Sequence, residues 1–320
     1  MINSQCYPGF LQRQSQFRAY VALAAVCFFW GTTYLGIRIA LEWVHPLQLM
    51  CLRYLLSGAP MLAVAFFTKA RLPERRELLY TSLFGVITIG MGTGTLAFAE
   101  LWIPSGLAAL IVSMQPFWMV SVEALIPGGD RLHAPTVVGM LVGIAGTALL
   151  VGPSAIQQGL TGAVFRSFLI LQIGACGWSL GSILHRRQNA RSHPVISAAL
   201  QQLATGLFFL GPAIVELRPH PLVWRWRGAG AILYLAVIGG AVGYTAYIYA
   251  LTKLPVSIAS IYTYVNPIVA LWLGWLFYRE PIGPREIIAM IVIFAGVALV
   301  RRFSRQAAAR LPQAAKAQTN

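Results

Sequence analysis

The sequence predicts an all-α integral membrane protein in which ten transmembrane helices form two inverted five-helix repeats around a central cavity. Three observations support this fold class. Of the 320 residues, 58% are hydrophobic and 10% are charged, whereas roughly 25% of the residues of a soluble domain are charged. Apolar stretches of about 20 residues, the length that crosses a bilayer, recur along the whole chain. The two halves of the chain also match each other at residues that occur in the same order.

The expected elements follow in order from these apolar stretches, which are separated by short segments rich in proline, glycine or charge. Residues 1–18 contain no apolar core, so we expect a cytoplasmic N-terminal segment and no cleaved signal peptide. The first repeat covers residues 19–152 and the second covers residues 167–302. A linker at 153–166 joins them, and a basic cytoplasmic tail follows at 303–320. The predicted spans are 19–41, 47–67, 78–99, 103–126, 135–152, 167–185, 194–216, 228–250, 255–278 and 284–301.

An internal repeat relates the two halves. Trp30, His45-Pro46 and Gly58 match Trp178, His193-Pro194 and Gly206, and 148 residues separate the members of each pair. Later matches, at offsets of 150 or 151 residues, pair Pro104, Pro116, Asp130 and Gly146 with Pro255, Pro267, Glu280 and Gly296. Because each repeat has an odd number of spans, the second repeat enters the membrane from the opposite side. Inverted repeats of this kind let a central site open alternately to the two sides, as in secondary transporters.

The distribution of basic residues predicts the orientation of the chain. Sixteen of the 24 Lys and Arg residues lie on one side of the predicted membrane and six lie on the other side. The positive-inside rule places the richer side, which includes both termini, in the cytoplasm. Arg218, Arg225 and Arg227 lie on the poorer side and locally oppose this assignment. We expect a multi-pass protein of the plasma (inner) membrane with cytoplasmic N- and C-termini.

Several function classes are disfavoured by the sequence. The formal charge of +15 does not indicate a nucleic-acid partner, because the basic residues cluster between apolar runs and not on a soluble face. The cysteines have no metal-binding spacing and no nucleotide fingerprint is found, so we expect no metal and no cofactor. A G-x-S-x-G match at 177–181 lies inside an apolar span, so it does not indicate a hydrolase or any other enzyme. The expected partners are the lipid bilayer and a small-molecule substrate, for a monomer or a homodimer.

Two arginines fall within predicted spans. Arg53 lies about six residues into the second span, roughly 9 Å below its start. An arginine at this depth is costly and usually faces the protein interior or a water-filled cavity. The sequence leaves two alternatives open for Arg53, namely a role facing a substrate or gate, and a side chain that snorkels to the interface. Arg38 lies four residues before Glu42, and we expect these two residues to form an interfacial ion pair.

Four acidic residues lie near the ends of spans. Glu100 closes the third span and Glu123 lies near the end of the fourth, so either is a candidate for proton coupling if it is buried. The alternative for both is a solvated residue at a span end. Asp130 and Glu280 occupy matched positions just before the fifth and tenth spans, where a carboxylate would complement the dipole of the helix that follows.

Two amide side chains directly precede prolines in the fourth and ninth spans, as Gln115-Pro116 and Asn266-Pro267. Pro116 and Pro267 are therefore predicted helix kinks, which leave backbone carbonyl groups free near the middle of the membrane. Gln115 and Asn266 could bind either this backbone or a substrate.

Aromatic residues gather at the same predicted depth. Together with Arg53, Gln115 and Asn266, they are the candidate lining of a substrate cavity. The aromatic candidates are Trp30, Tyr34, Trp178, Tyr244, Tyr247 and Tyr262. An interfacial aromatic belt is the alternative for each of them. Glycines with GxxxG spacing, at 139 and 143, 177 and 181, and 239 and 243, are expected to allow close packing of helices.

Several short motifs resemble a known family, the ten-span EamA-type branch of the drug/metabolite transporter superfamily. They are Phe29-Trp30-Gly31, His45-Pro46 with Arg53 seven residues later, Pro104 to Ala109 ahead of Pro116, and Asn266-Pro267 with Glu280 and Gly296. The resemblance covers residues 19–302 and implies two inverted repeats around a cavity, with Arg53 as the family's arginine of the second span. It also implies export of amino acids or related metabolites, often driven by a proton gradient. The chain departs from the family pattern at Asp130, which replaces a glutamate, and at Gln201, which occupies the position matched to Arg53.

The predicted function is secondary transport, with export of a small metabolite such as an amino acid or a related compound by alternating access. Glu100 and Glu123 are the candidates for proton coupling. A membrane receptor or scaffold would be expected to have a sizeable soluble domain or long loops, and neither is visible in the sequence. A channel usually gathers identical subunits around one axis, which the internal inverted repeat disfavours.

Overall fold

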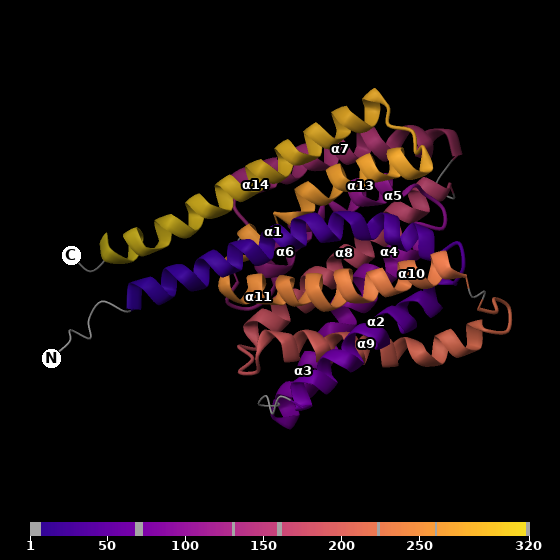
Figure 1. Ribbon diagram of the computed structural model, residues 1–320. Helices are drawn as coiled ribbons and strands as arrows, with labels where there is room; N and C mark the ends of the chain where they lie inside the picture. The colour runs from indigo at the N-terminus through magenta and orange to yellow at the C-terminus, as the bar shows by residue number, and fades with distance from the viewer. Residues whose placement is uncertain are drawn as a thin grey trace.

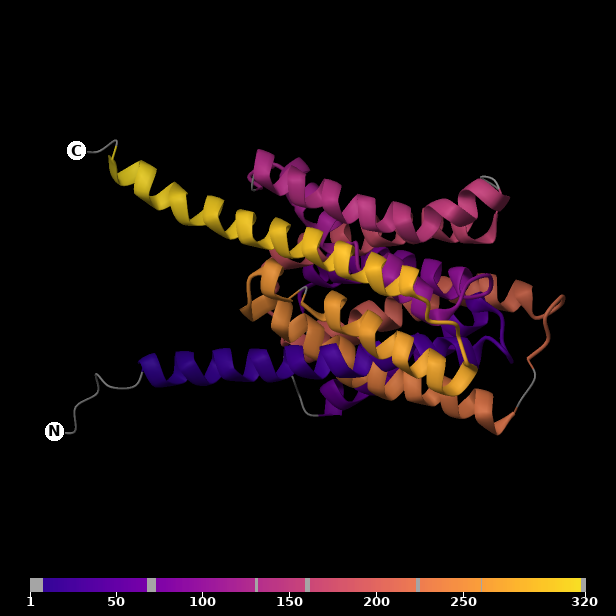
Figure 2. The ribbon, with the colours of Figure 1, turned by 90° about the horizontal axis from the view of Figure 1, so that it is seen from above.

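The computed structural model describes residues 8–67, 73–129, 132–158, 162–222, 225–259 and 261–317. Within these ranges every regular element is a helix, and the helices form ten stretches that run back and forth along one common direction (Figure 1). Both ends of the chain lie on the same side of the molecule, which we call the terminal side; the opposite side is the far side. Figure 2 shows the same arrangement from above.

The first five stretches form the first repeat. They are α1 (Pro8–Ala40), α2 (Pro46–Phe67), α3–η1–α4 (Arg75–Gly85, Val86–Met91 and Gly92–Ala99), α5–α6 (Ser105–Val112 and Gln115–Leu125) and α7 (Ala134–Gln158). The second repeat consists of α8 (Ala163–Arg187), α9 (Pro194–Glu216), α10–η2–α11 (Trp226–Tyr234, Leu235–Tyr244 and Thr245–Lys253), α12–α13 (Val256–Ala259 and Tyr262–Tyr278) and α14 (Pro284–Ala317).

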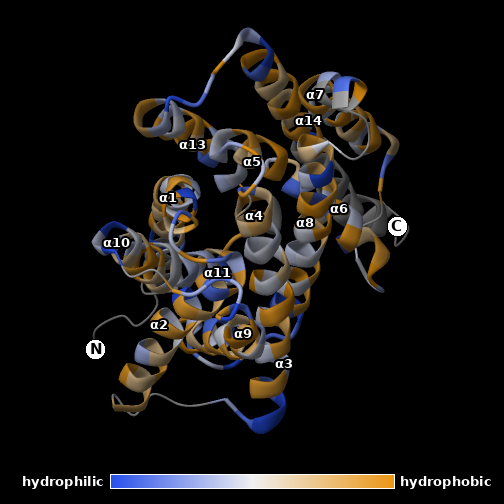
Figure 3. Cartoon of the chain, turned by 90° about the vertical axis from the view of Figure 1, so that its right-hand side faces the viewer, coloured by the Kyte–Doolittle hydropathy of each residue, from blue (hydrophilic) through white to orange (hydrophobic). Residues whose placement is uncertain are grey.

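The helices have the dimensions of membrane spans. Within the residues that the structure describes, the first eight of the ten stretches are long and apolar enough to cross a bilayer. α13, with 17 residues, is somewhat shorter than these eight. Side chains on the outer faces of the helices are apolar, among them Phe208, Trp272 and Ile291, which are each more than half exposed. Figure 3, a view from the far side, shows these hydrophobic outer faces and the hydrophilic residues at the helix ends. The chain is an all-helical membrane protein, as the sequence predicts.

Several helices extend beyond the predicted spans, three of them by six residues or more. α1 begins at Pro8, inside the predicted N-terminal segment, and α14 continues to Ala317, inside the predicted tail. α7 passes Gly152-Pro153 and ends at Gln158, so it occupies part of the predicted linker. Pro153 did not end the helix because the next residues, which include alanine, isoleucine and two glutamines, accept a further helical turn.

Repeat-matched glycines lie where equivalent helices of the two repeats cross. A Cβ atom on Gly58 of α2 would lie 2.4 Å from the backbone nitrogen of Leu203 in α9, and one on Gly206 would lie 2.7 Å from that of Leu55. Such distances are too short for any side chain, so α2 and α9 are in direct backbone contact. They lie side by side in Figures 1 and 3.

The fifth helices of the two repeats, α7 and α14, pack in the same way. A Cβ atom on Gly296 would lie 2.4 Å from the nitrogen of Gly143, and one on Gly146 would lie 2.8 Å from that of Ile293. Gly139 also abuts the backbone of α14. The predicted packing role of Gly139 and Gly143 is confirmed, and the two helix pairs show how the inverted repeats are joined.

The third stretch of each repeat contains a π-helical segment, η1 in the first repeat and η2 in the second. These segments occupy matched places, because Val86 and Leu235 begin them 149 residues apart. π-Helical turns are rare, and they often occur at functional sites. Their presence at equivalent positions makes the third stretch of each repeat a candidate for part of a functional site.

Candidate functional site

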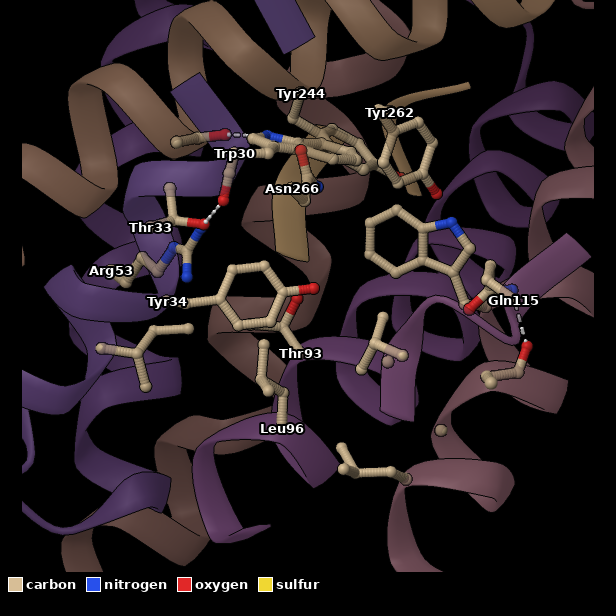
Figure 4. A pocket seen from close by; sticks show the side chains of 18 of the residues that line it. Trp30, Thr33, Tyr34, Arg53, Thr93, Leu96, Gln115, Tyr244, Tyr262 and Asn266 are labelled. Carbon is tan, nitrogen blue, oxygen red and sulfur yellow. Dashed lines mark hydrogen bonds between the residues drawn. The ribbon is translucent and has the colours of Figure 1, made fainter. Parts of the chain in front are cut away.

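A pocket lies at the centre of the molecule and is lined by helices of both repeats. The space between its side chains is about 700 Å³, including the part that opens to solvent. The lining residues are Trp30, Thr33, Tyr34, Ile37, Arg53, Tyr54, Gly92, Thr93, Leu96, Val112, Gln115, Leu171, Gly174, Ala175, Trp178, Gly239, Tyr244, Tyr262 and Asn266. Figure 4 shows Arg53 and Gln115 on opposite sides of this pocket, with Tyr34 and Asn266 between them.

The pocket contains most of the residues that the sequence nominated for a cavity. Eight of the nine line it, from Trp30 and Tyr34 of α1 to Asn266 of α13. The ninth, Tyr247, is buried behind the lining and contacts it through the rings of Trp30 and Trp178, at centroid distances of 5.1 and 5.5 Å.

Trp30 is the centre of an aromatic cluster that forms one wall of the pocket. Its ring lies 5.3 Å from that of Trp178 and 5.1 Å from that of Tyr262, in edge-to-face geometry, and stacks near Tyr244 at 6.3 Å. The indole nitrogen of Trp30 donates a hydrogen bond of 3.0 Å to the carbonyl oxygen of Gly239 in η2. These contacts join α1, α8, η2 and α13, so the wall is fixed by helices from both repeats.

Arg53 supplies the positive charge of the pocket. Its side chain is 5% exposed, and its guanidinium group lies over the ring of Tyr54 at 5.1 Å from the centroid. Nε and Nη1 have no hydrogen-bond partner in the part of the chain that the structure describes. A Cβ atom on Gly239 would lie 2.8 Å from Nη2, so this glycine leaves room for the guanidinium group. Arg53 therefore presents free donors to a pocket whose lining contains no carboxylate.

The two amides in the lining differ in their hydrogen bonding. Nε2 of Gln115 donates to the carbonyl oxygen of Ala175 at 2.8 Å and to the hydroxyl group of Ser179 at 2.6 Å. Gln115 thus connects α6 to α8. Oδ1 of Asn266 is buried and has no partner among the described residues. Asn266 is consequently a free acceptor in the same pocket in which Arg53 is a free donor.

Glu100 is fully buried directly after α4, and neither carboxyl oxygen has a hydrogen-bond partner among the described residues. Burial and the nearby carboxylate of Glu280 disfavour the ionised form of Glu100, and the positive charges of Arg38 and Arg53 partly oppose this. Arg38 donates a short hydrogen bond to the backbone carbonyl oxygen of Glu100. The predicted ion pair between Arg38 and Glu42 is not among the ion pairs of the described residues, because Glu42 faces Tyr278 and Arg227 instead.

Neither Glu100 nor the other acidic candidates are among the residues that line the pocket. Glu123 accepts a 2.6 Å bond from Arg187 at the terminal side, where both side chains are 30% exposed. Glu280 was expected to complement the helix that follows it, α14, and this is wrong. Its carboxylate instead accepts hydrogen bonds from the backbone nitrogens of Ser105 and Gly106, at 3.0 and 3.1 Å, and thereby caps α5 of the other repeat. Asp130 lies outside the described residues.

Glu286 caps α14 in place of Glu280. Its Oε2 accepts a hydrogen bond of 2.9 Å from the backbone nitrogen of Gly283, just before the helix begins. A capping residue in the first turn can be read from sequence, whereas the partner of Glu280 is 174 residues away and depends on the tertiary fold.

The two candidate kink prolines lie in different surroundings. The fourth stretch is interrupted at Ser113 and Met114, and Pro116 follows in the first turn of α6. Pro267 lies inside α13, and its stretch is instead divided before Tyr262. The two prolines share their place in the sequence repeat but do not share a place relative to the helix ends.

Sequence reasoning missed several lining residues, among them Thr33, Thr93 and Leu96, because small or apolar side chains inside a span carry no distinctive signal. Gly239 was assigned to packing, but it also lines the pocket and accepts the bond from Trp30. Thr93 lies shortly after the π-helical segment η1, and Gly239 lies inside η2. The π-helical segments themselves are not visible in composition or periodicity.

Comparison with known proteins places this geometry in context. The model of the EamA-like transporter family matches residues 17–152 and 166–302, once in each half of the chain. The chain is 31% identical over 282 residues to the uncharacterized inner membrane transporter YedA of Escherichia coli K12, covering 87% of this chain and 89% of YedA. It is 22% identical over 286 residues to a probable terminal-alkyne amino-acid exporter of Streptantibioticus cattleyicolor, covering 89% of this chain and 94% of that protein. A solved crystal structure with 22% identity superposes with a TM-score of 0.64, covering 90% of this chain and 98% of the other.

Proposed function

The chain belongs to the EamA-like transporter family of the drug/metabolite transporter superfamily, and from this premise we propose that it exports a small zwitterionic metabolite, an amino acid or a related compound, by alternating access. The family assignment makes it a membrane transporter of a small molecule. The identity of the solute, the direction of transport and the driving ion are the proposed parts.

One observation carries the choice of solute. Arg53 presents guanidinium N–H groups without a partner, and Asn266 presents a carbonyl oxygen without a partner, in one buried pocket with an aromatic wall. Buried polar groups without partners are costly, so a ligand that satisfies both is favoured. A carboxylate fits Arg53 because the guanidinium fork matches its two oxygens. An ammonium group fits Asn266, and an apolar side chain fits the aromatic wall.

The inverted repeat supports alternating access. Helices of both repeats line the pocket, so rocking one repeat against the other changes which side it faces. One chain contains both repeats and the whole pocket, so transport does not need a second copy. The basic residues favour a cytoplasmic terminal side, and YedA is named as an inner membrane transporter, which supports the same membrane for this chain.

Glu100 is the proposed carrier of the coupled proton. An ionised carboxylate that is buried without hydrogen bonds is costly, so burial favours the protonated form of Glu100. Contact with water favours the ionised form, as do the positive charges of Arg38 and Arg53. A group whose protonation changes with its exposure can couple proton movement to the conformational cycle. Glu123 is less suited to this role, because it is partly exposed and forms an ion pair with Arg187.

Ligand binding to the purified protein tests this proposal. Trp30 and Trp178 line the pocket, so a bound solute should change tryptophan fluorescence. We expect binding of some amino acids, and at least about tenfold weaker binding of their amide analogues, which lack the carboxylate. In Arg53→Ala the acid and its amide should bind equally weakly, whereas exposed Arg225→Ala should behave like wild type. Equal affinity of the wild type for acid and amide would contradict the assignment of the carboxylate to Arg53.

A further inference from the structure

A second cluster of ligand-type side chains lies away from the pocket, at the far-side ends of α2 and α9. His45 directly precedes α2, Glu216 ends α9, and His220 follows four residues later. One ligand atom from each lies within 4.8 Å of the other two. Oε1 of Glu216 is 2.6 Å from Nδ1 of His220 and 3.7 Å from Nε2 of His45. The two imidazole rings are stacked with their centroids 5.0 Å apart.

We propose that His45, Glu216 and His220 bind a divalent transition-metal ion of the Zn²⁺ class, which joins the two repeats at the far side. This site does not depend on the proposed solute or on the direction of transport. Two imidazole nitrogens and one carboxylate are a recognised set of three zinc ligands, with the fourth position taken by water. His220 is 58% exposed, which gives water and the ion access to the cluster.

The backbone at both histidines is held by one buried side chain. Gln48, which is 2% exposed, accepts a hydrogen bond from the backbone nitrogen of His45 at 3.0 Å through Oε1. Its Nε2 donates to the backbone carbonyl oxygen of His220 at 2.6 Å. A single amide therefore fixes the spacing between two segments that are 175 residues apart in the sequence. Support of this kind positions metal ligands before the ion arrives.

A bound ion would disturb little of the present hydrogen bonding of the His45 ring. Nδ1 of His45 now faces the backbone nitrogen of Leu47 at 3.5 Å, at the outer limit of a hydrogen bond. An ion on Nε2 moves the ring proton to Nδ1, so only this weak contact is given up.

The internal repeat supplies a natural comparison. His193 matches His45 and also precedes a helix, and its Nδ1 accepts a hydrogen bond of 3.3 Å from the backbone nitrogen of Val195. His193 belongs to no metal-type cluster among the described residues, because only His45 has a carboxylate and a second histidine nearby. His193→Ala thus removes an imidazole and its helix-capping contact while leaving the cluster intact.

Zinc titration of the purified, tag-free protein tests the proposal, with bound metal counted by elemental analysis and thermal unfolding as a second readout. We expect one Zn²⁺ per chain and a rise in Tm with zinc in wild type and His193→Ala. His45→Ala and His220→Ala should each bind at least tenfold more weakly. Glu216→Gln, which keeps the shape of the side chain, should also weaken zinc binding. This variant replaces His45→Ala in the test if His45→Ala does not fold. A wild type without stoichiometric zinc, or cluster variants that bind as wild type does, would overturn the proposal.

Discussion

Arg53 and Gln201 occupy matched positions in the two repeats and have different tasks. Arg53 contributes a cation with free donors to the pocket. Gln201 is fully buried and accepts a hydrogen bond from Tyr244, which itself lines the pocket. The inverted repeats are therefore alike in fold but chemically unequal at the centre. This asymmetry lets an anionic group of a solute bind in one orientation.

The sequence identified Arg53 as a candidate site residue because a charge within an apolar span is conspicuous and costly. Its surroundings were not predictable in the same way. Gly239 makes room for the guanidinium group only because α2 and η2 come together in the fold. Likewise, the burial of Glu100 depends on tertiary packing, whereas its position at a span end favoured a solvated side chain.

The two acidic candidates can be separated by substitution. Glu100→Gln should abolish solute uptake driven by a pH gradient but leave exchange of labelled for unlabelled solute, because the neutral amide mimics the protonated carboxyl group. Glu123→Gln should lose the ion pair with Arg187 and keep both activities within about twofold, since partly exposed pairs contribute about 0–1 kcal/mol. Both activities can be measured in the same proteoliposomes. Gradient-driven uptake by Glu100→Gln at the wild-type rate would remove Glu100 from the coupling mechanism.

At the scale of helices, the sequence predicted which segments cross the membrane but not how they deviate from regular α-helix. Spans are visible because the bilayer requires about 20 apolar residues. The π-helical segments η1 and η2 change only the hydrogen-bond step, and this leaves composition unchanged. The capping of α5 by Glu280 was also missed, since it joins residues 174 positions apart. Gly139 and Gly143, in contrast, were correctly assigned to helix packing, and the structure places them at the crossing of α7 and α14.

The close crossing of α2 and α9 predicts a sharp difference between two glycines of α9. Gly206→Ala would place a methyl group 2.7 Å from the backbone nitrogen of Leu55, so the helices must separate, at a cost of about 1–3 kcal/mol. Gly211→Ala meets no atom within 4 Å beyond its chain neighbours, so its cost is limited to the strain that Pro212 imposes on a preceding alanine in a helix. Thermal unfolding in detergent should show the larger loss of Tm for the first variant. Equal Tm values for both variants would argue against direct backbone contact.

Pro116 and Pro267 are predicted to bias the two conformations in opposite directions, because they lie in inverted repeats. Replacement of either by alanine restores a backbone donor and should shift the inward–outward equilibrium by about 1–3 kcal/mol. Pro116→Ala should have the larger effect, since it directly follows the interruption at Ser113 and Met114. The readout is labelling of a cysteine at Thr263 by membrane-impermeant reagents in a Cys-free background. Unchanged labelling in both variants would leave the prolines as static packing features.

At the scale of the whole molecule, the ten-helix fold and the internal repeat were predictable because both leave periodic signals across the entire chain. The orientation in the membrane is a separate prediction that rests on the basic residues. Reporter fusions after Arg76 and after Arg302 should read as cytoplasmic, and a fusion within 153–165 should read as external. The opposite pattern would reverse the assignment of the terminal side, and three readings on one side would contradict the inverted repeat.

The central claim is that solute passes through the pocket by way of Arg53. Counterflow in proteoliposomes tests it most directly, because uptake of a labelled amino acid against its unlabelled form requires solute binding and reorientation of the loaded protein but no ion gradient. We expect uptake by wild type and by Arg225→Ala, and a loss of about 10- to 100-fold in Arg53→Ala, which corresponds to the 1.5–3 kcal/mol of a charged hydrogen bond. Arg53→Lys should be intermediate, since it keeps the charge without the planar fork. Wild-type counterflow in a correctly inserted Arg53→Ala protein would contradict the claim.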